Sequence, residues 1–159
     1  MTASKYLATY LNDHLAGATI GVELARRAAS ENAGTPLGEF LSELAAEIAE
    51  DRVTLRGIMA SLGVGADRKK VALGWLGEKL GRLKPNAQLR GYSPLSPLVE
   101  LEALLLGIEG KRLLWRSLQA IAGDHGLPAV RLDELVTRAR GQRDRVERRR
   151  AALLEEALG

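Results

Sequence analysis

The spacing of apolar residues over residues 36–62 constrains the fold more than any other feature of the chain. The residues that recur there at intervals of three and four are Leu37, Leu41, Leu44, Ile48, Asp51, Leu55, Ile58 and Leu62. Because an α-helix turns once in 3.6 residues, this spacing places all of them on one face. The pattern predicts an amphipathic helix whose apolar stripe contains one carboxylate, Asp51.

The same periodicity predicts three further long helices, over about residues 4–31, 96–122 and 129–158. NAGTP (32–36) and GDHGLP (123–128) separate neighbouring helices, and Thr35 followed by Pro36 is typical of a helix start. No segment shows the sustained alternation of a β-strand, so the expected fold class is all-α. At 159 residues the chain is expected to form one domain, 1–159, whose core needs no disulfide or metal.

The second and third helices are joined by a long connection, residues 63–95. Within it, Val71, Trp75, Leu76, Leu80 and Leu83 predict a short amphipathic helix. A connection of this length can cross the whole bundle and start the third helix at the same end as the second. A short loop, a long crossover and a short loop between four helices are the connectivity of a ferritin-like four-helix bundle.

Several stretches carry a resemblance to known proteins: YLNDHLAG (10–17), GTPL (34–37), EDR (50–52), GWLGEKLGRLK (74–84), SPL (96–98) and VELEALLLGIEGKRLLW (99–115). The whole chain resembles the ferritin-like superfamily and, more narrowly, an uncharacterised bacterial family within it that lacks the di-iron ligand motifs. This resemblance implies a fold and no particular reaction.

The metal ligands of ferritin-like oxidases are not reproduced here. Those proteins use a Glu-x-x-His motif on each of two helices, but Leu11 precedes His14 by three residues and Ala122 precedes His125 by three. We therefore expect no cofactor. The alternative is a degenerate carboxylate site for iron or manganese, whose candidate ligands are Glu47, Glu102 and Glu109.

Polar residues on the apolar stripes predict a buried polar layer at mid-height. If the first two helices are antiparallel about a turn near residue 33, His14 and Asp51 lie at the same height. The third helix brings Lys111 or Arg112 to that height, and Arg112 lies closer to the stripe of Leu101, Leu105, Ile108 and Trp115. The fourth helix adds Gln142 or Arg143. We expect Asp51 to accept hydrogen bonds from His14 and Arg112, which would neutralise the layer and repel a divalent cation.

The charge pattern and the small residues of the first helix indicate which partners the protein could bind. The 23 basic residues are mixed with 20 acidic ones, and the arginines of the last helix point around its axis without interleaved aromatic residues, which argues against a nucleic-acid interface. Gly17, Ala18, Gly21 and Ala25 allow close approach of another helix, within the monomer or across a homodimer.

Three functions follow from these patterns. The first is a non-enzymatic bundle that acts through protein–protein interaction with an unknown partner, with a homodimer left open. The second is a ferritin-like metalloprotein that binds iron or manganese in a stress-related role. The third is weak binding of nucleic acid or an anionic surface. No secretory leader or run long enough to span a bilayer stands out in the sequence, so we expect a cytoplasmic protein.

Overall fold

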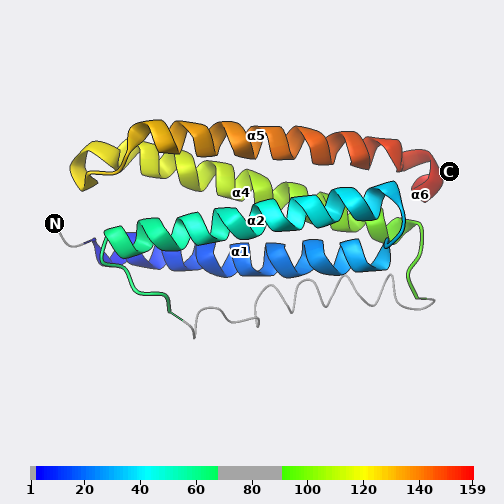
Figure 1. Ribbon diagram of the computed structural model, residues 1–159, viewed down its shortest axis with the longest axis horizontal. Helices are drawn as coiled ribbons and strands as arrows, with labels where there is room; N and C mark the ends of the chain where they lie inside the picture. Colours follow the sequence, from blue (N-terminus) through cyan, green and yellow to red (C-terminus); the bar gives the residue numbers. More distant parts are fainter. Residues whose placement is uncertain (1–2, 68–90) are drawn as a thin grey trace.

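The computed structural model describes residues 3–67 and 91–159, and all regular structure in them is helical (Figure 1). The helices are α1 (Lys5–Glu31), α2 (Pro36–Ser61), α4 (Leu95–His125), α5 (Ala129–Ala152) and the short α6 (Leu154–Leu158). The prediction of an all-α fold is confirmed. None of these described helices is long and apolar enough to cross a membrane. The helix expected within residues 71–83 lies outside the described residues.

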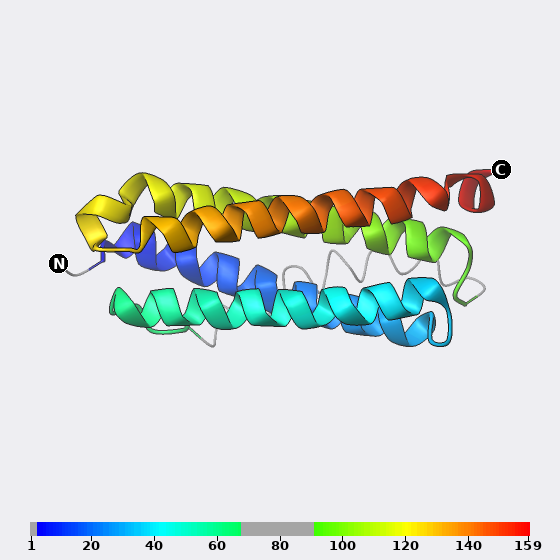
Figure 2. The same ribbon diagram turned by 45° about the horizontal axis from the view of Figure 1, so that its top comes forward.

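The four long helices form two antiparallel hairpins. α1 packs along α2, and α4 packs along α5, while α1 also contacts α4. Figure 1 shows that α4 begins at the same end of the bundle as α2, so these two helices run parallel. In the turned view of Figure 2 the two hairpins lie side by side, and the two termini are at opposite ends of the bundle.

The apolar core consists of two clusters, one toward each end of the bundle. One contains Leu11, Leu55 and Trp115, and the other contains Val22, Ile48 and Leu104. Along α2, Asp51 lies between Ile48 of one cluster and Leu55 of the other. A buried carboxylate therefore stands where the two halves of the core meet.

The start of α2 follows from its capping residues. Thr35 accepts a hydrogen bond from the Gly38 N–H at its Oγ1 (3.1 Å), and Pro36 occupies the first turn, where its missing N–H has no consequence. Gly34 has a φ of 78°, which turns the chain between the two helices. The backbones pack so closely here that a Cβ at Gly38 would lie 2.1 Å from the Asn32 carbonyl oxygen.

Two helix ends differ from those predicted. α4 continues through Gly123 to His125 and ends at Gly126, which has a φ of 64°. The left-handed residue, rather than the first glycine of GDHGLP, terminates the helix. The last helix was expected to be continuous to residue 158, but it is interrupted at Leu153, and α6 follows.

Gly38→Ala should lower the melting temperature, because its Cβ would press on the Asn32 carbonyl. Gly57→Ala on the same helix is the matched control: it is exposed, its Cβ meets nothing within 4 Å, and it should stabilise the protein by about 0.5–1 kcal/mol through helix propensity. Thermal melts followed by circular dichroism measure both. Equal effects of the two substitutions would contradict the close approach.

Candidate functional site

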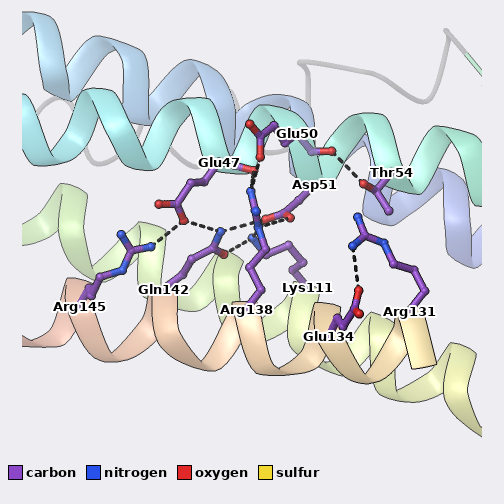
Figure 3. A network of polar contacts seen from close by, with 10 residues as sticks. All are labelled: Glu47, Glu50, Asp51, Thr54, Lys111, Arg131, Glu134, Arg138, Gln142 and Arg145. Atoms are coloured by element: carbon purple, nitrogen blue, oxygen red, sulfur yellow. Dashed lines mark hydrogen bonds and ion pairs between the residues drawn. The ribbon is translucent and has the colours of Figure 1, made fainter. Parts of the chain in front are cut away.

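The centre of the bundle is organised around the Asp51 carboxylate, which is 4% exposed. Lys111 Nζ of α4 donates to Asp51 Oδ2 at 2.5 Å, and Gln142 Nε2 of α5 donates to the same oxygen at 3.0 Å. Arg138 Nε lies 3.0 Å from Oδ1 (Figure 3). Oδ2 thus accepts two hydrogen bonds from the opposite hairpin, whereas Oδ1 is paired with the Arg138 charge without a hydrogen bond from Nε among the described residues.

The contacts continue outward from Asp51 as a network. Gln142, whose exposed fraction is 0%, accepts from Lys111 and donates to Glu47 as well as to Asp51. Arg145 donates to Glu47 at 2.6 Å, and Arg138 donates to Glu50 at 2.6 Å. We call this set the ion network; its members are Glu47, Glu50, Asp51, Lys111, Arg138, Gln142 and Arg145. The carboxylates of α2 are balanced by an equal number of cations from α4 and α5.

Burial and pairing shift the pKa values inside the network in opposite ways. Burial lowers the pKa of Lys111, and the charge and hydrogen bond of Asp51 oppose that shift only in part. Burial by itself would raise the pKa of Glu47, but the hydrogen bonds from Arg145 and Gln142 outweigh it and leave the pKa below its ordinary value. Glu47 is therefore held in its ionised form.

The predicted meeting of Asp51 with Gln142 is found, but His14 lies elsewhere. No hydrogen bond joins His14 to Asp51 in the described part of the chain; its ring instead packs edge-on against Tyr10, with centroids 4.6 Å apart. Leu15, which is 1% exposed, occupies the core position, and one residue on a helix corresponds to a rotation of about 100°. Burial lowers the pKa of the His14 imidazole despite the nearby charge of Asp13.

The expected roles of Arg112 and Arg143 are also wrong. Arg112 donates to Glu109 on its own helix, at 2.6 Å and 2.9 Å, and Lys111 takes the place beside Asp51. Leu101, Ile108 and Trp115 are buried as predicted. Leu104, 2% exposed, completes this stripe instead of Leu105, and Lys111 lies on the same face two turns after Leu104. The Arg143 side chain is 44% exposed and pairs with Asp144.

The candidate metal ligands are each paired with a guanidinium group. Glu47 pairs with Arg145, Glu109 with Arg112, and Glu102 with Arg150 at 3.5 Å. Within residues 3–67 and 91–159, no three side chains of the His, Cys, Asp or Glu type are grouped so that they could hold a metal ion. Glu47 belongs to the ion network, and Glu102 and Glu109 pair with arginines elsewhere, so the three carboxylates do not converge on one metal position.

Next to the ion network lies a cavity of about 610 Å³ between α1, α2 and α4. Its polar end is lined by Tyr10, Asp13, His14, Asp51, Arg52, Lys111 and Trp115. Its other end is lined by small and aliphatic residues, among them Gly17, Gly21, Leu24, Ala103, Leu104 and Gly107. Glycine and alanine on the facing sides of α1 and α4 leave this volume open, because they place no side chain in it.

Trp115 lines the cavity, but its indole N–H has almost no accessible surface there. The residue is 1% exposed, and its indole Nε1–H is buried without a hydrogen-bond partner among the described residues. Buried donors in folded proteins are nearly always paired, so such a group calls for an acceptor.

Sequence patterns missed part of this site, although one signal was present. Arg138, Gln142 and Arg145 are spaced by four and three residues, which places them on one face of α5. The other arginines of this helix, which point in several directions around its axis, hide that pattern in the sequence. Lys111 was considered, but the stripe chosen for α4 favoured Arg112. Nothing in the sequence indicated the cavity, because empty space depends on how the helices pack.

Comparison of the chain with protein-family models, with curated proteins and with solved structures gives no match. The function is therefore argued from the geometry of the site.

Asp51→Leu should destabilise the protein by about 3–5 kcal/mol, because it strands the buried Lys111 ammonium. The double variant Asp51→Leu/Lys111→Met removes both buried charges and should recover most of that loss. Urea denaturation gives the free energies of unfolding. Arg112→Met is the control, since its partner is Glu109, and it should leave the transition close to that of the unsubstituted protein. Equal loss in the single and double variants would contradict a paired ion network.

Acid should weaken the fold through Glu47. Its pKa in the folded protein lies below the ordinary value of 4.5, so its contribution is fully present above that value and is lost as pH falls through the folded pKa. Glu47→Gln should therefore make the melting temperature fall less steeply as the pH is lowered below 4.5. Melts across an acidic pH series for both proteins test this, and parallel curves would contradict it.

Proposed function

We propose that the protein is a non-catalytic binding module whose site is the cavity between α1, α2 and α4, and whose ligand is small and mostly apolar. The observation that carries this proposal is the cavity itself: about 610 Å³, with apolar walls and polar groups gathered at one end. Small-molecule sites in proteins have this character, with volumes of roughly 300–1,000 Å³ and a few polar groups that orient the ligand.

The ion network supports binding over metal chemistry. A metal ion needs carboxylates that can turn toward it, but here Asp51 is occupied by Lys111, Gln142 and Arg138. The connectivity of two hairpins, with α4 parallel to α2, supports a ferritin-like origin of the bundle. In this proposal the ion network stands where ferritin-like relatives hold iron or manganese, and it fixes one wall of the cavity.

The protein-interaction hypothesis has one specific observation in its favour. Leu106 and Leu113 of α4 are 78% and 48% exposed, and Tyr6 of α1 is 86% exposed. Leu106 also lines the cavity. An apolar helix, including one from a second copy of this chain, is therefore the second candidate occupant of the same face.

Nucleic-acid or anionic-surface binding has less support. Several arginines of α5 are paired with carboxylates: Arg138 with Glu50, Arg143 with Asp144, and Arg150 with Glu147. Pairing of this kind reduces the positive potential that would attract phosphate groups.

The neutral dye Nile red should bind the protein saturably, with a rise in fluorescence, and Gly107→Leu should weaken that binding by about tenfold or more. The Cβ at Gly107 meets nothing within 4 Å, so the leucine enters open space in the cavity wall. Gly141→Leu on α5 is the matched control, because it is exposed, equally unobstructed and outside the cavity.

Three outcomes separate the candidates. Loss of dye binding in Gly107→Leu alone supports the cavity. Equal binding by all three proteins, or no binding, contradicts it. Sedimentation of the same samples tests the second candidate: a dimer that dissociates only in Gly107→Leu would identify the face as an interface between copies.

A further inference from the structure

The cavity is polarised along the bundle axis. On α1 its lining passes from Tyr10, Asp13 and His14 at one end to Leu24 at the other, a span of about 21 Å at 1.5 Å per residue. On α4 the cavity-lining residues between Ala103 and Gly110 are all apolar, and the polar lining residue Lys111 follows them. A ligand that matches these walls has one polar end and an elongated apolar part.

The polar end has more donors than acceptors to offer. An ammonium group has three N–H donors, and Lys111 uses two of them on Asp51 and Gln142. The acceptors are already balanced: Asp51 Oδ2 accepts two hydrogen bonds, Oδ1 is ion-paired with Arg138, and Asp13 interacts with the His14 side chain.

Arg52 supplies a positive charge at the same end. It lines the cavity from α2, is half-buried, and forms no hydrogen bond or ion pair within residues 3–67 and 91–159. Lys111, by contrast, is neutralised by Asp51. A guanidinium group prefers a planar anion that can accept two parallel hydrogen bonds, and a carboxylate has that geometry.

From these groups we infer that the cavity binds a long-chain aliphatic carboxylic acid, with its carboxylate at Arg52 and its chain directed toward Leu24 and Ala103. This inference rests on the proposed function and names its ligand class. An amine is disfavoured because the acceptors at the polar end are already balanced by Lys111, Arg138 and His14. A sugar is disfavoured because the apolar end has no hydrogen-bonding side chain for its hydroxyl groups.

The test compares three probes of equal chain length: dodecanoate, dodecanol and methyl dodecanoate. Each displaces Nile red from the unsubstituted protein at neutral pH, below the concentration at which dodecanoate forms micelles. Dodecanoate should displace the dye at about tenfold lower concentration than either neutral probe, because a charge-assisted hydrogen bond is worth about that factor.

Substitutions at Arg52 locate the carboxylate. Arg52→Met should weaken dodecanoate by about tenfold and leave dodecanol unchanged, while Arg52→Lys should restore part of the preference. Trp115→Phe removes an indole N–H that is not accessible from the cavity, so it should affect dodecanoate and dodecanol alike. Arg56→Met, one turn further along α2, exposed and outside the cavity lining, is the matched control and should change neither.

The outcomes distinguish failure of this inference from failure of the proposed function. If all three probes displace the dye equally, or if Arg52→Met weakens them equally, the cavity binds apolar ligands but the carboxylic-acid class is wrong. If the dye binds and the ester matches dodecanoate, the site recognises a carbonyl group rather than a charge, which also overturns the inference. If neither dye nor probes bind, the proposed function itself fails.

Discussion

Neutralisation of Asp51 is the constraint on which the centre of this bundle depends. A carboxylate that is only 4% exposed is stable in a helical core only when donors surround it, and here Lys111, Gln142 and Arg138 do so from two other helices. Those contacts form at one relative height of the helices. The ion network therefore sets the register of α2 against α4 and α5, and it divides the apolar core into two clusters.

The network and the cavity divide the interior of the bundle between them. α5 supplies Arg138, Gln142 and Arg145 to the network, whereas α1 supplies no side chain to it and instead forms a wall of the cavity. Asp51 and Lys111 belong to both, because they also line the cavity's polar end. The paired charges thus give that end fixed walls, while the Arg52 guanidinium group keeps its donors for an acceptor. This arrangement is the physical basis of the proposed binding function.

Local patterns predicted the helices well and the site only in part. The starts of α1 and α2 lie within one residue of those expected, and the contact between Asp51 and Gln142 was anticipated from their heights along the bundle. The errors at His14 and Arg112 share one cause. In each case the neighbouring residue, Leu15 or Lys111, faces the core instead, and a step of one residue turns a side chain by about 100°. The spacing of apolar residues allows either neighbour on the stripe, and packing against the other helices decides between them.

The sequence by itself determined an all-α chain, the ends of its first helices and a polar residue in the middle of an apolar stripe. These features depend on neighbours three or four residues apart, so they can be read locally. Only the tertiary structure decided that Lys111 rather than Arg112 faces Asp51, and that glycines of α1 and α4 leave a cavity beside it. Partner choice and empty volume depend on the rotation and spacing of several helices at once, and no single segment encodes them.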